Sequence, residues 1–469
     1  MRRHLLVATL LWIVLLVAAV FVSGCSVRKP YAAPVVTPVV LGQAAGPEFA
    51  QQAYDPRWWR LFEDPVLERL EAAALASNLD IRQAVARVEQ ARAMFRDAEL
   101  DRYPVAAVGA SVDVREQVVP GFVAEPLRTN TYRAGLQAFW ELDFFGGIKS
   151  SVQSAQAEAQ GLEVSLEDVR VVVAAEVARS YFFLRGLQQQ LAVAERSLTN
   201  QREALRLTGV RRDAGVGEEQ DVASAAASVA AVEASIPPLR AGLAVQRHRL
   251  AVLVGVRPGD LVEDLSPRAY APLVTTLPVG ETGELLRRRP DVRAAERRLA
   301  AATAREGIAA ADLYPRVSIS GVVGLLAGRG NLFARAASRQ WAVTPALSWV
   351  GSDLGGARAR LRGSEAATRE VLARYDQTVL RAIEEAENAL VGYREAQAQL
   401  ERLMDQARQS ARSADLARTR YREGLTDFLD LLVAERMHLG AEDAVARVEA
   451  GVFGSVVDVY KALGGPAAP

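Results

Sequence analysis

Apolar side chains alternate with small or polar side chains in four separate parts of the chain. These stretches lie near residues 104–115, 131–143, 315–326 and 340–350. In the second stretch the even-numbered positions carry Leu136, Ala138 and Trp140, while the odd-numbered positions carry Gln137 and Glu141. A period of two places successive side chains on opposite faces of a strand. About ten residues of this pattern are typical of a membrane-spanning barrel strand, so the sequence predicts four such strands.

The segments between the strands carry a helical pattern instead. Residues 146–213 contain no proline, and their apolar positions recur in steps of three and four. This spacing predicts one long helix with a coiled-coil seam. Residues 218–254 are expected to form a return helix that Pro237 and Pro238 interrupt, because proline removes a backbone donor.

The whole pattern is duplicated. Matching residues recur at a shift of 211 or 209, and the pairs are Asp80 with Asp291, Tyr103 with Tyr314, Trp140 with Trp349, Gly215 with Gly424, and Asp221 with Asp430. Duplication with so small a register change predicts two structural repeats, 57–265 and 266–465. Each repeat is expected to contain a long helical hairpin, with Gly215 or Gly424 in its turn.

Four strands cannot close a barrel, and open sheet edges are excluded from lipid. The chain is therefore expected to share a barrel with copies of itself. Three copies give 3 × 4 = 12 strands, whereas two give eight and a lumen filled by side chains. The predicted fold class is a mixed α/β membrane protein: a trimeric 12-stranded barrel continuing into a long α-helical barrel, with internal duplication. A soluble β-sandwich is the alternative for the strands, and the long helices argue against it.

The N-terminus carries a processing signal. Residues 1–24 begin with basic side chains, continue as an apolar run and end in small residues before Cys25, the one cysteine of the chain. This arrangement resembles a bacterial lipoprotein signal, in which Cys25 becomes the acylated first residue; a plain transmembrane anchor is the alternative. Ser26 in place of aspartate implies an outer-membrane address. Residues 25–56 read as a lipidated tether, and 466–469 as a short tail.

Composition excludes several classes of function. The formal net charge is +0, so the composition gives no sign of the basic surface that binds nucleic acid. His4, His248 and His438 are scattered, so no metal site is predicted, and no phosphate-binding loop occurs. The sequence therefore predicts neither an enzyme nor a cofactor. A coiled-coil scaffold lipoprotein stays open as an alternative, although it would not need four matched strands.

Several motifs in order resemble the outer membrane efflux protein family, the TolC/OprM-like outer membrane factors, and most closely its lipoprotein branch. They are WWRLFEDP at 58–65, WELDFFGG at 140–147, SIPPL at 235–239, RRPDVRAAE at 288–296 and YREG at 421–424. The resemblance implies a lipid-anchored outer-membrane homotrimer with a large periplasmic part. It implies passive export of small molecules received from a periplasmic adaptor (membrane fusion) protein and an inner-membrane RND-type transporter. A duct for type I protein secretion is the alternative, and the sequence does not identify the cargo or the pump.

The resemblance also implies site residues. Leu429 and Asp430 fall on the family's gate rings at the helix tips, and Val433 stands where the family commonly has a second aspartate. Tyr421 is a candidate latch and Asp221 the repeat partner of Asp430. Adaptor contact is implied at Gly215 and Gly424, and a membrane-interface role is expected for Trp140 and Trp349. The simpler readings are a first-turn carboxylate for Asp430, ordinary packing for Tyr421 and generic strand aromatics for the tryptophans.

Overall fold

The computed structural model describes residues 30–35, 38, 40–53, 55–118, 126–268, 276–349 and 351–465. Cys25, the leader before it and the tail 466–469 lie outside these ranges, so their predicted roles stay predictions. The chain forms two compact units, and each draws on both halves of the sequence. The sheet unit comprises Met1–Val35, Arg87–Leu162 and Ala294–Asp376, and the helical unit comprises Val36–Ala86, Glu163–Arg293 and Gln377–Pro469.

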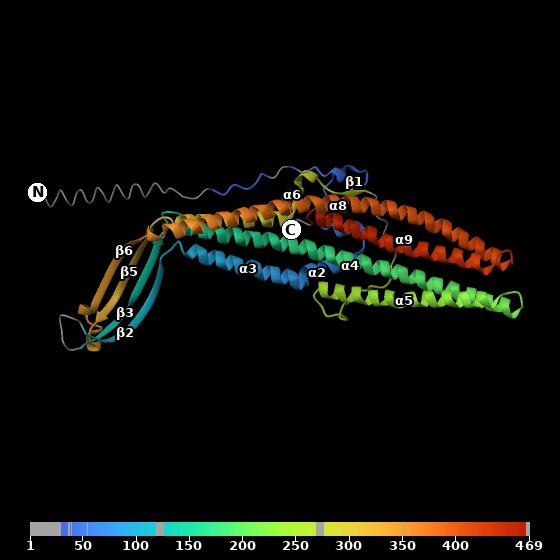
Figure 1. Cartoon of the computed structure of the whole chain (residues 1–469). Helices are drawn as coiled ribbons and strands as arrows, with labels where there is room; N and C mark the ends of the chain where they lie inside the picture. Colours follow the sequence, from blue (N-terminus) through green and yellow to red (C-terminus); the bar gives the residue numbers. More distant parts are fainter. Residues whose placement is uncertain are drawn as a thin grey trace. The chain divides into compact units, whose positions relative to one another are not determined.

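Helices dominate the described residues. The α-helices are α2 (Pro65–Ser77), α3 (Leu79–Leu100), α4 (Gly147–Asp213), α5 (Glu219–Leu253), α6 (Leu285–Arg288), α7 (Pro290–Ala311), α8 (Leu354–Arg422) and α9 (Phe428–Ala462). The short 3-10 helices are η1 (Gly42–Ala45), η2 (Trp58–Phe62), η3 (Thr282–Glu284), η4 (Gly330–Leu332), η5 (Ala336–Ser338) and η6 (Gly351–Asp353). The predicted long helix over 146–213 is confirmed by α4. In the helical unit, α4 with α5 and α8 with α9 form two hairpins (Figure 1).

The expected interruption of the first return helix is wrong. α5 runs from Glu219 to Leu253 with Pro237 and Pro238 inside it. Each proline removes one backbone hydrogen bond, but Val232 and Ile236 on the same stretch are buried. Packing of that face holds the helix through the missing bonds. Among the described helices, α5 alone has the length and apolar composition that a membrane crossing would need.

The four predicted strands pair into one antiparallel sheet in the order β2-β3-β5-β6 (Figure 1). Their bounds are β2 (Val105–Gln117), β3 (Leu127–Leu142), β5 (Arg316–Ala327) and β6 (Arg339–Ser348). One row across the sheet joins Val108, Leu136, Val323 and Trp341 through successive register pairs. The apolar side chains of all four strands therefore lie on one face of the sheet. Trp341, on this face, is 79% exposed. The other face carries the polar parity, as the alternation predicts.

The main hydrophobic core lies in the helical unit, around the 58–65 motif. The Trp58 ring stacks on Tyr460 at 5.5 Å, and the Phe62 ring meets Phe182 at 4.5 Å. Asp64 begins α2 by accepting from the Val66 amide at 2.8 Å. A parallel pair of two-residue strands, β1 (Phe49–Ala50) and β4 (Leu277–Pro278), lies in the same unit. The aromatic side chains of the motif are part of this core.

Candidate gate at the helix tips

The two hairpin turns have the same backbone design. Gly215 and Gly424 both adopt positive φ, at 74° and 72°. The Val216 amide donates to the carbonyl of Arg211, four residues before Gly215, at 3.0 Å. The Leu425 amide donates to the equivalent carbonyl in the second turn at 2.8 Å. A left-handed residue just past a helix end is the usual place for glycine, so the prediction of two turn glycines is confirmed.

Tyr421 is packed inside the tip, with 2% of its surface exposed. The centroid of its ring lies 5.8 Å from that of Phe428. The Arg211 guanidinium lies over the Tyr421 ring, with Cζ 4.6 Å from the ring centroid. Arg211 also donates to the Tyr421 carbonyl at 2.9 Å. The pKa of Tyr421 is raised above its ordinary value, chiefly because the side chain is buried. The Arg211 charge opposes this shift, and the nearby Asp221 carboxylate adds to it. The first turn thus contributes a cation and a carboxylate around an aromatic ring of the second.

Asp430 lies in the first turn of α9. Its amide donates to Asp427 Oδ1 at 3.0 Å, and the Thr426 hydroxyl donates to the Asp430 carboxylate. Asp427 is the N-cap of the helix. A carboxylate here is stabilised by the free amides and dipole of the helix start. The first-turn reading of Asp430 therefore has direct support, and it leaves the carboxylate exposed at the tip.

An apolar stripe continues from the tip along α9. Leu429, Val433 and Met437 follow each other at intervals of four and are all at least half exposed. Residues at this spacing lie on one face of a helix. The sequence reading named Leu429 and Val433 but missed Met437, although the same spacing would have reached it. Val216 and Leu425, at matched positions of the two turns, are also exposed.

Two polar ties behind the tip were not predicted. Arg418 of α8 binds Glu435 of α9, with Nη2 donating to Oε2 at 2.9 Å, and Glu435 is buried. Arg436 of α9 donates to the Ser228 hydroxyl of α5 at 3.2 Å. Arg418 and Glu435 lie 17 positions apart on consecutive helices, whereas Arg436 and Ser228 lie 208 positions apart. Neither the repeat shift nor helical spacing points to these pairs. They connect the second hairpin within itself and to the first.

The two tryptophans occupy equivalent places at the helix-bearing end of the sheet. The Trp140 indole donates to the Arg102 carbonyl at 2.9 Å, and the Trp349 indole to the Leu313 carbonyl at 3.3 Å. Each acceptor immediately precedes a Tyr-Pro pair. Both side chains are on or beside the apolar face and are exposed. A ring with one polar anchor and one apolar body suits a membrane interface.

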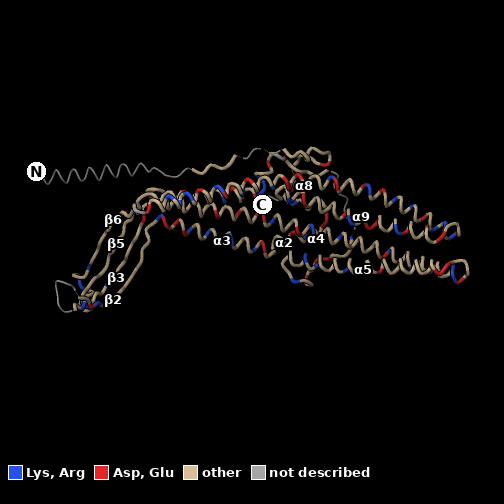
Figure 2. Tube along the Cα trace, viewed as in Figure 1, with Lys and Arg blue, Asp and Glu red and all other residues tan. Residues whose placement is uncertain are grey.

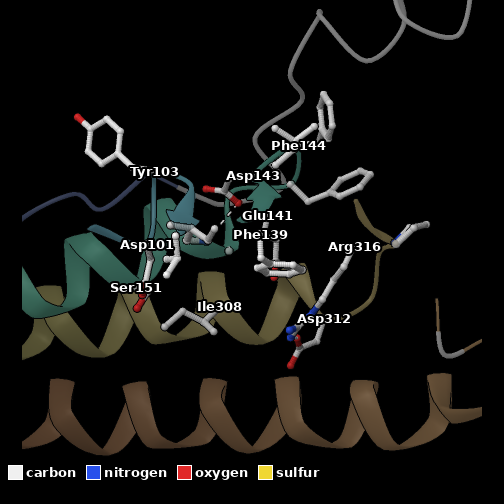
Figure 3. A pocket seen from close by; sticks show the side chains of 17 residues that line it. Asp101, Tyr103, Phe139, Glu141, Asp143, Phe144, Ser151, Ile308, Asp312 and Arg316 are labelled. Carbon is white, nitrogen blue, oxygen red and sulfur yellow. Dashed lines mark hydrogen bonds and ion pairs between the residues drawn. The ribbon is translucent and has the colours of Figure 1, made fainter. Parts of the chain in front are cut away.

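A cavity of about 360 Å³ lies in the sheet unit, where the strands meet α4 and α7 (Figure 3). Arg316 binds Asp312 at its edge at 2.7 Å. Asp143 accepts from the Ile148 and Lys149 amides at 3.1 and 2.6 Å, which caps α4. These carboxylates therefore serve the strand-to-helix joints. Among the described residues, no group of three or more His, Cys, Asp or Glu is placed to hold a metal ion.

Comparison with known proteins gives consistent matches. Pyoverdine export outer membrane protein OpmQ of Pseudomonas putida is 30% identical over 426 residues, covering 89% of each chain. Nodulation protein T of Rhizobium leguminosarum bv. trifolii is 29% identical, covering 92% of each chain. The solved structure of the outer-membrane channel OprN is 44% identical, with a TM-score of 0.92, and covers 94% of this chain and 99% of its own.

The fold matches are not limited to one structure. The Neisseria gonorrhoeae MtrE outer membrane channel, solved in its open state, is 26% identical, with a TM-score of 0.84. It covers 94% of this chain and 98% of its own. The family model of the outer membrane efflux protein matches residues 70–256 and 282–465, one segment in each half of the duplicated sequence. The chain belongs to the outer membrane efflux protein family.

Proposed function

We propose that this chain is the outer-membrane channel of a tripartite efflux system, in which three copies share one 12-stranded barrel. The observation that carries the proposal is the sheet. Its four apolar parities lie on one face in matched register, and β2 and β6 are its end strands. Such a sheet cannot enter lipid alone, because the end strands would leave backbone groups without partners. Three copies remove every edge and enclose a water-filled lumen.

The helical hairpins of the three chains form the periplasmic part of this channel, and their tips form its gate. Three-fold symmetry brings three Asp430 carboxylates together, with Leu429 and Val433 adding apolar constrictions. A carboxylate ring disfavours anions, and mutual repulsion raises the cost of ionising all three. Tyr421 and Arg211 hold the two turns of one chain together behind the ring. Separating the turns exposes a buried aromatic ring, so closure is the resting state.

An adaptor docks at the turns around Gly215 and Gly424, and an inner-membrane RND-type transporter supplies the cargo. The exposed Val216 and Leu425 give each turn an apolar contact. Related proteins carry names that refer to pyoverdine, toluene and antibiotics. These names support small-molecule export for this chain. Acylation at Cys25 adds a lipid anchor to the barrel.

The decisive experiment is native mass spectrometry of the full chain extracted in detergent, combined with conductance in planar bilayers. A lipidated trimer that forms a pore of low resting conductance is the expected result. A monomer or dimer would overturn the shared barrel and revive the scaffold reading. A trimeric pore whose deletion abolishes protein secretion, with unchanged drug susceptibility, would replace efflux with the secretion duct.

A further inference from the structure

The end of the sheet that adjoins no α-helix is rich in arginine. The helices α3, α4, α7 and α8 all adjoin the other end, so this end consists of strand termini and the connections between them. Its described arginines are Arg115, Arg128, Arg133, Arg329, Arg335 and Arg339, and its described carboxylates are Asp113 and Glu116. Six cations against two anions leave +4 among the described residues of this end. Figure 2 shows the charged positions at this end, beyond the uncharged middle of the strands.

One of the six arginines is already neutralised. Arg115 binds Asp113, with Nε 2.6 Å from Oδ1 and Nη2 donating to Oδ2 at 2.9 Å. Glu116 faces Arg128 across the β2–β3 ladder. Within the described ranges, no ion pair involves Arg128 or Arg339. The positive charge of these two side chains is therefore available to bind a partner.

Strand parity places two of these arginines on the lipid side. Arg128 has the parity of Tyr132 and Leu136 on β3, and Arg339 has the parity of Trp341 on β6. Both therefore project from the apolar face, each near the start of its strand. Arg339 is two residues beyond Trp341, which is about 7 Å along a strand. A cation directly beyond an exposed tryptophan is the order of side chains expected at a membrane headgroup layer.

The connection between β5 and β6 presents its arginines on an ordered platform. η4 and η5 fill most of it, and the buried Ser338 hydroxyl donates to the Leu332 carbonyl at 2.6 Å. The Arg335 amide donates to the same residue's carbonyl at 3.2 Å, and the Ser338 amide donates to Arg335 at 3.0 Å. Arg329 and Arg335 are exposed, and each directly precedes one of these short helices. Little backbone ordering is needed before they bind.

We propose that these four arginines, the arginine rim (Arg128, Arg329, Arg335 and Arg339), bind the phosphate groups of a phosphorylated glycolipid in the outer leaflet of the membrane. The inference rests on the proposed function, which places this end of the sheet at the outer surface. Guanidinium groups match phosphate oxygens two at a time, and they keep their charge at any physiological pH. A headgroup lipid with acyl chains meets both the rim and the apolar face beneath it, whereas a soluble anion meets the rim alone.

The test is native mass spectrometry of the full-length trimer titrated with bisphosphorylated lipid A and, separately, with its dephosphorylated form. The double variant Arg128→Gln/Arg339→Gln is expected to bind the phosphorylated lipid about 25-fold more weakly, since each arginine near an anionic lipid surface contributes roughly a fivefold factor. Arg115→Gln is the control: it removes one positive charge at the same end, but from the polar face and from an existing ion pair. It is expected to leave lipid binding unchanged.

Two results would overturn the proposal: equal binding of the dephosphorylated lipid, or equal losses in the double variant and in Arg115→Gln. If the double variant fails to form trimers, Arg329→Gln/Arg335→Gln tests the rim outside the strand ladder, and unchanged binding there rejects it. Trimer mass and pore conductance are recorded on the same samples. A pore without phosphate-dependent lipid binding rejects the rim alone, whereas loss of trimer and pore in the parent protein rejects the proposed function.

Discussion

Asn78 and Arg289 occupy equivalent positions of the two sequence halves and make the same hydrogen bond. The Asn78 amide donates to the Leu253 carbonyl at 2.8 Å, and the Arg289 guanidinium donates to the Ala462 carbonyl at 2.9 Å. Both acceptors are the final residues of the return helices α5 and α9. Each bond satisfies a carbonyl that the end of a helix leaves without an internal partner. The duplication has therefore conserved a joint while changing the residue that makes it.

Arg289→Met is expected to lower the free energy of unfolding by about 3 kcal/mol, because it leaves buried groups without a partner. The Arg289 side chain is 7% exposed and also binds Asp291 at 2.7 Å and Glu385 at 2.6 Å. Thermal unfolding of the purified protein measures the change. Arg287→Met, which removes an exposed pair with Glu284, is the control and should cost less than about 0.5 kcal/mol. Equal melting temperatures for the two variants would contradict this role.

Gly255→Ala is expected to destabilise the same joint by about 2–3 kcal/mol. Gly255 has a φ of 78°, and an added Cβ would lie 2.5 Å from the Ser77 carbonyl oxygen. Gly363→Ala is the matched control inside α8, where no atom lies within 4 Å of the added Cβ. That variant should gain about 0.5–1 kcal/mol from helix propensity. A Gly255→Ala protein that melts with the parent would show that the turn relaxes freely.

Glu71 should make stability depend on pH. The side chain is fully buried on α2, neither carboxylate oxygen has a hydrogen-bond partner, and burial raises its pKa well above the ordinary value. The folded state then keeps the proton that the unfolded chain releases near pH 4.3. The stability from this group is complete below that pH and is lost as pH rises toward the raised pKa. Glu71→Gln is expected to melt higher at pH 8 and to flatten the pH profile; an unchanged profile would reject a neutral Glu71.

Asp430→Ala is expected to raise the closed-state conductance severalfold in planar bilayers and to weaken cation preference, because it removes the proposed carboxylate ring. Asp415→Ala is the control. It removes an exposed carboxylate that binds Arg418 on α8, away from the first turn of α9. If both variants conduct like the parent when closed, Asp430 serves only the start of its helix.

Cys25→Ser is expected to lose the proposed acylation and still assemble, because in the proposed trimer the barrel supplies most of the membrane anchorage. Intact mass of the purified protein measures the missing acyl groups, and fractionation measures its location. Recovery of the variant as a soluble monomer would show instead that the lipid anchor is required for insertion.

The alternation of apolar and polar side chains predicted the sheet well. In a strand whose two faces meet different environments, side-chain polarity must alternate every two residues. The duplication placed the turn glycines, since both helix ends need a residue in the left-handed conformation at the same position. Pro237 and Pro238 misled the helix prediction. Their local cost is real, but packing of Val232 and Ile236 outweighs it, and packing is not visible in local spacing.

The tip was predicted only in part for a similar reason. Leu429 and Asp430 could be reached from the turn motif, because they lie a few residues after Gly424. Arg211 could not, because its contact with Tyr421 joins residues 210 positions apart. Such a contact depends on how two hairpins pack, which no single segment encodes.

The end strands β2 and β6 also limit how the cell can make this protein. A newly exported chain holds a sheet whose two edges lack partners among the described residues, so insertion by one copy alone is unfavourable. In the proposed trimer three copies must meet before the barrel closes, so the yield of pores is expected to fall steeply when synthesis is slow. The proposed assembly therefore implies that most chains stay unassembled at low expression, and that the number of channels rises with gene dosage only above a threshold.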